Sequence, residues 1–270
     1  MNAWQVLRQI EYLAQNRNWT GGSTPVFGGV SVVTTPEPEL LQNIRCPYLA
    51  IKLSDGTEDP LHDEEPGLTL QRIMCTILQT VSSGYTGRGS LIGANRTGGF
   101  TQSKGRGITE IQRELYEVIK VLHQDLGVKI LGRAKGPADA VRDEKMGYIS
   151  YRGYNWDLLI SDEPFYHPIR FLTASDLGGG QARLSWTNPP QRFDRYQLVI
   201  RRAAGSTPPP DPTSGDPVYS GTFISFYDDT PGAGQFSYSV FVAYDETNKP
   251  GALAQADSYS AATSRTVTVS

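Results

Sequence analysis

The sequence predicts two domains, an α+β domain followed by an all-β sandwich, and three observations support this. The 270 residues exceed what one hydrophobic core usually organises, so two domains are the starting expectation. Two apolar stripes at helical spacing lie within the first 130 residues. Short alternating strands, separated by Gly, Pro and Asp turns, follow residue 170. We therefore expect domains at residues 1–165 and 166–270.

The composition is that of an ordinary soluble globular protein. Hydrophobic residues make up 38% of the chain and charged residues 20%, and the formal net charge is −3. No apolar run suits a membrane span or a secretion signal, so we expect no membrane partner and no export by the usual route. A weakly acidic chain has no overall attraction for nucleic acid, so any DNA contact must be local. The two cysteines, Cys46 and Cys75, are too few for a disulfide framework, and we expect both to be reduced and partly buried.

The first domain is predicted to be a mixed or antiparallel sheet packed with two main helices. Apolar residues recur at helical spacing from Ala3 to Ala14 and again from Ile108 to Leu126, and Gly127 suits the left-handed cap of the second helix. A polar stretch around Gly136 and Pro137 separates the second helix from the last of the expected extended segments. Extended segments are expected at 26–27, 30–33, 48–53 and 146–160.

The segment Leu68–Ser82 carries two conflicting patterns. Its apolar residues fit helical spacing, whereas Ile73, Cys75 and Ile77 alternate as in a strand and the neighbouring threonines favour extension. Periodicity alone favours a helix. We predict a strand, for a reason that rests on a family resemblance described below.

The second domain resembles fibronectin type III domains. Arg183–Pro190 (RLSWTNPP) is similar to the second strand of that family, and Phe193–Arg202 to the third. Later strands are expected at 216–221, 223–229, 236–244 and 263–269. The resemblance implies a sandwich core that includes Trp186, Tyr196, Leu198, Tyr238 and Val240, and it places Phe236 where many relatives have the tyrosine of the tyrosine corner. The run Pro208–Pro210 is predicted to be a stiff exposed loop, with a ligand for a proline-reading domain as the alternative.

The first domain resembles the tail terminator proteins of long-tailed bacteriophages. The resemblance lies in the order of elements and in Cys46–Leu53, which is followed by an acidic loop and then by Leu68–Ser82. In that family the long segment is a strand, which is why a strand is predicted here. Membership would imply a virion protein of the tail or neck, assembled in the host cytoplasm. It would form a ring, typically a hexamer, that caps the tail tube, stops its polymerisation and offers a docking surface to head–tail connector proteins.

Two charged loops are candidate contact surfaces in such a ring. The glycine-rich loop 84–107 carries four cations and no acid, and it would face passing DNA phosphates, without base reading, or order against a neighbouring subunit or the tail tube: Arg88, Arg96, Lys104 and Arg106. The other loop is acidic and is predicted to face solvent or an interface rather than to hold a metal, because its spacing is not that of an EF-hand: Glu58, Asp59, Asp63, Glu64 and Glu65.

No motif predicts catalysis. The segment Gly87–Gly93 departs from nucleotide-binding glycine motifs, and His62, His123 and His167 lie far apart without metal-ligand spacing. We expect no enzyme activity, no cofactor and no metal. Two other readings stay open: an adhesion or carbohydrate-binding surface protein, with Tyr219 or Tyr259 stacking on sugars, and a hydrolase whose carboxylates converge from distant positions.

Overall fold

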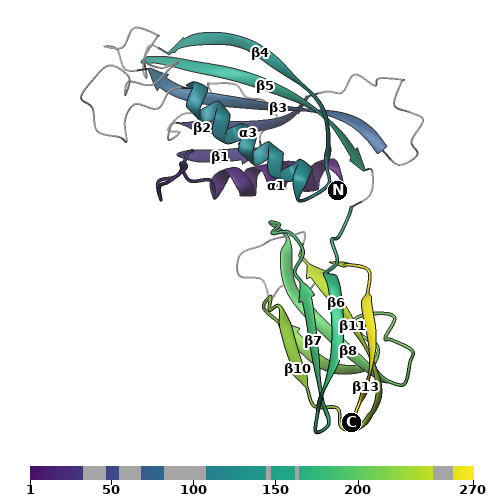
Figure 1. The fold of residues 1–270 in the computed structure, drawn as a ribbon. Helices are drawn as coiled ribbons and strands as arrows, with labels where there is room; N and C mark the ends of the chain where they lie inside the picture. Colours follow the sequence, from purple (N-terminus) through teal and green to yellow (C-terminus); the bar gives the residue numbers. More distant parts are fainter. Residues whose placement is uncertain (33–46, 55–67, 82–107, 144–146, 162–163, 246–257) are drawn as a thin grey trace. The chain divides into compact units, whose positions relative to one another are not determined.

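The computed structural model describes residues 1–32, 47–54, 68–81, 108–143, 147–161, 164–245 and 258–270. The chain divides into two compact units, Met1–Pro164 and Phe165–Ser270 (Figure 1). Within the described residues strands predominate, and the two helices both belong to the first unit. Each unit has a hydrophobic core of its own.

The first unit contains a five-stranded sheet with the strand order β1-β2-β3-β5-β4. Strands β1 and β2 run parallel, and the other neighbours are antiparallel. Its elements are α1 (Ala3–Gln15), β1 (Gly29–Val32), β2 (Tyr48–Ser54), β3 (Leu68–Val81), α3 (Ile108–Gln124), β4 (Lys129–Asp143) and β5 (Gly147–Ser161).

The two helices begin and end as local chemistry requires. Asn2 and Gln5 form a capping box at the start of α1, with each side chain accepting from the other's backbone N–H at 2.9 and 3.2 Å. After α3, Gly127 adopts a φ of +70°, which confirms the predicted left-handed glycine. The N–H of Val128 then donates to the carbonyl of Leu122 at 3.0 Å and closes the helix end.

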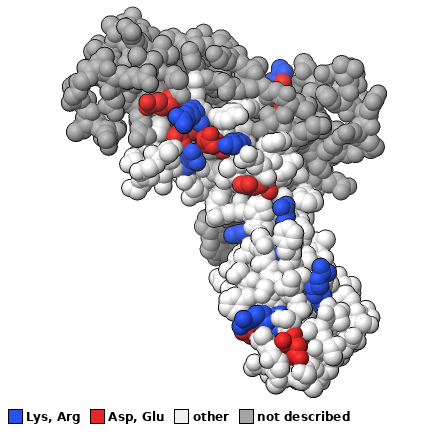
Figure 2. Space-filling view, viewed as in Figure 1, with Lys and Arg blue, Asp and Glu red and all other residues white. Residues whose placement is uncertain are grey.

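Buried contacts hold the two helices together on the sheet. Their apolar stripes share one core cluster with residues of β2, β3 and β5. Arg17, just after α1, donates to the buried Glu114 of α3 at 2.6 Å, and Thr20 donates to the same carboxylate at 3.0 Å. Figure 2 shows cations and acids interleaved on the described surface of this unit. This pattern is typical of a helix surface stabilised by pairs of opposite charge.

Strand β3 confirms the predicted extended segment over Leu68–Val81. It is paired along its length with β5 and over seven residues with β2, so neighbouring strands satisfy its backbone groups on both sides. Ile73, Cys75 and Ile77 point into the core, as their alternation predicts. Cys75 is buried and unpaired, and burial raises the pKa of its thiol to about 12. Cys46 lies outside the described residues.

Strand β4 is not among the extended segments predicted from the sequence, and it includes the polar stretch around Gly136 and Pro137. The strand continues through both residues, and its register against β5 shifts between Lys135 and Ala138. Proline lacks an N–H, so it is tolerated in a strand only at an edge or an irregularity. Strand β4 is an edge strand of the described sheet, and Pro137 lies at the register shift, so the proline is tolerated on both grounds.

The second unit is the predicted β-sandwich. One sheet has the order β10-β7-β6, and the other has the order β12-β11-β8-β9 with β13 also pairing with β11. The apolar cluster of this unit draws on both sheets. Its strands are β6 (Arg170–Gly178), β7 (Gln181–Thr187), β8 (Arg195–Ala204), β9 (Asp216–Gly221), β10 (Phe226–Asp229), β11 (Gly234–Tyr244), β12 (Ser258–Tyr259) and β13 (Thr263–Val269).

One of the predicted core residues of the sandwich lies outside the core. Trp186, Leu198, Tyr238 and Val240 are buried, whereas Tyr196 is 41% exposed. The reason is a register shift between β8 and β11, where Gln197 pairs with Ala243 but Arg195 pairs with Tyr244. Tyr196 is thus the extra residue of a β-bulge, which takes it out of the inward alternation of β8.

Candidate functional site

Both charged loops predicted as contact surfaces lie outside the described residues. These are the cations Arg88, Arg96, Lys104 and Arg106 and the acids Glu58, Asp59, Asp63, Glu64 and Glu65. Among the residues that the structure describes, no group of three His, Cys, Asp or Glu side chains is placed to hold a metal ion. No helix in that part of the chain is long and apolar enough to cross a membrane.

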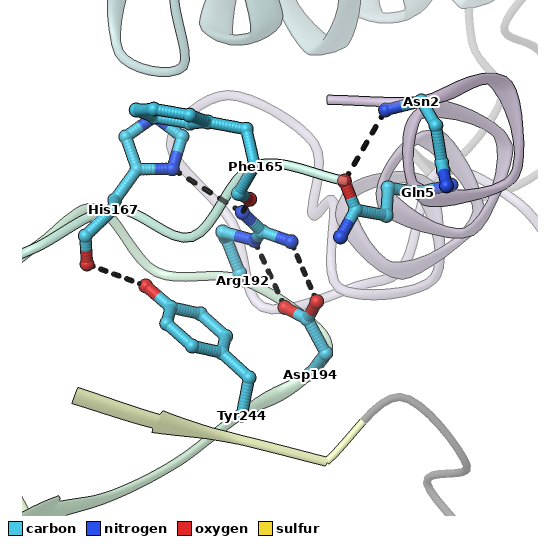
Figure 3. A network of polar contacts seen from close by, with 7 residues as sticks. All are labelled: Asn2, Gln5, Phe165, His167, Arg192, Asp194 and Tyr244. Carbon is cyan, nitrogen blue, oxygen red and sulfur yellow. Dashed lines mark hydrogen bonds and ion pairs between the residues drawn. The ribbon is translucent and has the colours of Figure 1, made fainter. Parts of the chain in front are cut away.

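The densest polar network of the second unit lies where the chain enters the sandwich (Figure 3). The Arg192 guanidinium donates twice to the Asp194 carboxylate, at 2.9 and 2.5 Å, and both side chains are completely buried. It also donates to the carbonyl of Phe165 and lies 3.3 Å from Nδ1 of His167. Because guanidinium nitrogens only donate, Nδ1 of His167 accepts, and the imidazole is the neutral Nε2–H tautomer.

Tyr244 completes this network from β11. Its hydroxyl donates to the carbonyl of His167 at 2.7 Å, and its ring lies 4.9 Å beneath the Arg192 guanidinium. Burial raises the pKa of Tyr244, so the hydroxyl keeps its proton at neutral pH. The bonds from Arg192 to Phe165 and His167, and from Tyr244 to His167, join segments distant in sequence, and together they fix residues 165–167 onto the sandwich (Figure 3).

A second network joins the two sheets about 20 Å farther along β11, at the strand's usual rise of ~3.3 Å per residue. Asp229 of β10 accepts from Arg202 of β8 and from the hydroxyl of Tyr238, both at 2.8 Å. Asp216 accepts a further bond from Arg202 at 3.2 Å. Burial and the Asp229 carboxylate raise the pKa of Tyr238. Phe236, at the predicted position of the tyrosine corner, has no hydroxyl. Tyr238, two residues later, has one, and it donates to the side chain of Asp229.

The proline run is only in part the exposed loop that the sequence predicts, because Pro210 is exposed but its neighbour in the run is not. Pro209 is buried, and its carbonyl accepts from Ser239 of β11 at 2.6 Å. Ser237 donates to the carbonyl of Gly205 at 2.7 Å, and Arg201 donates to that of Pro212 at 2.5 Å. These bonds hold segment 205–215 against β11, on the side where Ser237 and Ser239 point out of the sandwich core. A proline-reading domain would first have to break them.

Asp211 shapes the same loop from within. Its carboxylate accepts from the hydroxyls and the backbone N–H groups of Thr213 and Ser214, at 2.6 to 2.9 Å. The hydroxyl of Ser214, then that of Thr213, lower the pKa of Asp211 well below its usual range, so it is ionised at neutral pH. One short acidic side chain thereby fixes the turn that follows the prolines.

The outer face of the β6–β7–β10 sheet carries six polar or aromatic side chains in a regular grid. Strand pairing places Phe226, Ser185 and Thr173 in one row across the three strands. It places Asp228, Arg183 and Ser175 in the next row. We call these six residues the sandwich platform. Five of them are exposed, and Ser185 is partly exposed.

An ion pair organises the platform. Arg183 donates from Nε and Nη2 to the two carboxylate oxygens of Asp228, each at 2.7 Å, and its guanidinium lies 5.3 Å from the centre of the Phe226 ring. The hydrogen bond between them raises the pKa of Arg183 and lowers that of Asp228. Both groups stay charged at neutral pH, and the pair carries no net charge.

Of the two tyrosines that the sequence offered for stacking on sugars, Tyr259 is 36% exposed and Tyr219 is partly buried. The hydroxyl of Tyr219 donates to the carbonyl of Thr222 at 2.7 Å, and its ring packs 5.3 Å from that of Tyr227. Tyr259 lies at the end of the other sheet. The sequence shows the alternation of the platform residues along each strand: Thr173 and Ser175, Arg183 and Ser185, Phe226 and Asp228. It does not show that these three strands are neighbours in one sheet.

Comparison with known proteins gives fold likenesses only. No protein-family model matches the sequence, and no curated protein matches it. Similar solved structures include a computationally redesigned β-sandwich protein, with 13% identity and a TM-score of 0.29 over 39% of this chain and 91% of that chain. Others are domains d3–d4 of the rat CD45 extracellular region, with 8% identity and a TM-score of 0.25 over 51% and 63% of the two chains, and titin domains A168 to A170, with 11% identity and a TM-score of 0.25 over 75% and 59%. The chain spans less than two thirds of the CD45 and titin structures.

Proposed function

We propose that this chain is a structural virion protein whose first unit assembles with copies of itself into a closed ring that caps a phage tail tube. The ring, expected to be a hexamer, would stop tube polymerisation and present a docking surface to head–tail connector proteins. The observation that carries the proposal is the sheet of the first unit. Its order of elements is that of the tail terminator resemblance, and its last strand, β4, has 15 residues.

Strand β4 offers a surface that a second copy can cover. On its outer side no described strand pairs with it, so backbone N–H and C=O groups point away from the sheet there. The opposite edge strand, β1, has only four residues, so the two edges are different surfaces. Contact between unlike surfaces is head-to-tail, and such contacts form closed rings when the rotation allows it.

The second unit would be a fibronectin type III-like domain carried by this ring. Its three-stranded sheet β10-β7-β6 faces a sheet in which β9 pairs with β8 rather than with β10. This arrangement, together with a buried Trp186 on the second strand, supports the class. The fold alone assigns no activity, because sandwiches of this class serve many functions.

The proposal assigns the protein no catalytic role. The one described cluster that combines His, Arg, Asp and Tyr is the network of His167, Arg192, Asp194 and Tyr244, and its bonds hold the chain's own backbone and side chains. The tail tube protein and the neck proteins would be its partners. Contact of Arg88, Arg96, Lys104 and Arg106 with passing DNA stays a prediction, as does the interface role of the acidic loop.

The assembly is testable through β4. The N–H groups of consecutive strand residues point to opposite sides of the strand. Of the two variants Ala140→Pro and Val141→Pro, one therefore removes an N–H that points away from the sheet, and the other removes an N–H that bonds to β5. We expect native mass spectrometry and electron microscopy to show rings for the wild type. One variant should keep its circular dichroism spectrum but lose the ring, and the other should lose sheet content. A wild type that stays monomeric at every concentration, or a ring that survives both substitutions, contradicts the proposal.

The alternative, a carbohydrate-binding surface protein, is favoured by one observation. Phe226 is 54% exposed beside the Arg183–Asp228 pair on the open face of the sandwich. This observation concerns the second unit only, so it is compatible with a ring built by the first.

A further inference from the structure

We infer that the sandwich platform is a binding site for a neutral carbohydrate. The inference goes beyond the capping ring and does not depend on it. It rests on three properties of the platform: its dimensions, its balanced charge and its single exposed aromatic ring.

The platform has the dimensions of a short oligosaccharide. Neighbouring strands lie ~4.8 Å apart, and alternate residues of one strand are separated by roughly 7 Å. The six side chains therefore cover an area of about 10 by 7 Å, which suits one or two sugar rings. The hydroxyl of Thr173 already donates to the carbonyl of Ser185 at 3.3 Å, so it faces a ligand as an acceptor.

The balanced charge of the platform selects for a neutral ligand. An anion drawn to Arg183 would meet the carboxylate of Asp228, and a cation drawn to Asp228 would meet the guanidinium. A pair of neighbouring sugar hydroxyls can accept from Arg183 and donate to Asp228 at once, so it uses both partners.

Phe226 supplies the apolar part of the site. The C–H face of a pyranose is apolar and packs on aromatic rings, and this ring is more than half exposed. The Arg183 guanidinium holds it from one side, and the two-fold bond to Asp228 holds the guanidinium. These contacts bias the three side chains toward the arrangement that would contact the sugar, which reduces the entropy cost of binding.

A protein partner fits the platform less well. The six platform residues cover about 10 by 7 Å, far less than the ~800 Å² that each side of a stable protein interface buries, and the exposed Phe171 and Leu177 of β6 are not among them. On the outer face of the opposite sheet, segment 205–215 already covers part of β11, because Ser237 and Ser239 donate to its carbonyls. The platform is the sandwich face left open for a small polar ligand.

The test uses the full chain on an array that carries neutral glycans, acidic glycans and unglycosylated proteins. We expect neutral glycans to be retained, and a retained oligosaccharide then to be titrated by calorimetry. Phe226→Ala should weaken its binding by about tenfold or more, since aromatic stacking and the apolar area are both lost. Arg183→Gln and Asp228→Asn should weaken it as well. The matched control is Tyr196→Ala, which removes an exposed aromatic ring from the other sheet.

Several outcomes would overturn the inference. One is a wild type that retains no glycan, or only acidic glycans in a manner abolished by moderate salt. Another is binding to unglycosylated protein alone, which would make the platform a protein contact. A third is neutral-glycan binding that survives Phe226→Ala or falls equally in Tyr196→Ala. Circular dichroism of each variant shows whether the fold is kept, and a result on ring assembly alters none of these outcomes.

Discussion

Two arginine–aspartate pairs of the sandwich have the same geometry and opposite surroundings. Arg192 and Asp194 are completely buried, whereas Arg183 and Asp228 keep 46% and 40% of their side-chain surface exposed. The buried guanidinium needs further acceptors, and it finds them in Phe165 and His167. The exposed pair can exchange its bonds with water or a ligand at little cost. Burial thus makes one pair part of the fold and leaves the other available for binding.

The largest expected effect comes from breaking the buried pair. Asp194→Asn removes the negative charge and leaves the Arg192 guanidinium buried without its counter-charge. We expect the free energy of unfolding to fall by about 3–5 kcal/mol. Urea unfolding followed by circular dichroism and tryptophan fluorescence measures it. The matched control is Asp228→Asn, the same change at the exposed pair, and equal effects in the two variants would contradict the comparison.

An intermediate effect is expected at the network between the sheets, where burial is partial. Tyr238→Phe removes the hydroxyl that donates to Asp229, and Asp229 keeps its bond to Arg202. The loss of one hydrogen bond predicts a fall of about 1 kcal/mol in the free energy of unfolding. The same unfolding experiment measures it, with Tyr196→Phe as the exposed control. If both variants unfold alike, the hydroxyl of Tyr238 contributes nothing to joining the sheets.

The sequence predicts much of the fold because the buried apolar residues recur with the period of the helix or strand that carries them. Alternation marks β7, β8 and β11. In β3 the periodicity favours a helix and the strand is predicted from the family resemblance; pairing with two neighbouring strands accounts for its extended form. The failures occur where alternation is interrupted. Tyr196 sits in a bulge, and Pro137 at a register shift, and neither irregularity has a periodic signature. Pro209 was assigned to solvent from composition, but its burial depends on Ser239, thirty positions later.

The candidate sites depend even more on contacts distant in sequence. Arg192 and Asp194 are two positions apart, so their pairing was visible, but His167 and Tyr244 reach the same network from either side. Nothing local marks that pair as buried. The platform likewise forms only once β6, β7 and β10 are known to be neighbours. Sequence reasoning could identify outward-facing residues but could not select the rows that share a face.

The smallest expected effect sharpens the comparison most. Arg183→Gln removes one partner of the exposed pair, and water can solvate both the glutamine and the freed Asp228 carboxylate. The free energy of unfolding should therefore change by less than about 1 kcal/mol. Salt should have little further effect on the variant's stability, because the screened pair is already gone. A loss close to that of Asp194→Asn in the same urea experiment would mean that Arg183 supports the sheet, and the platform would then no longer be a surface free to bind.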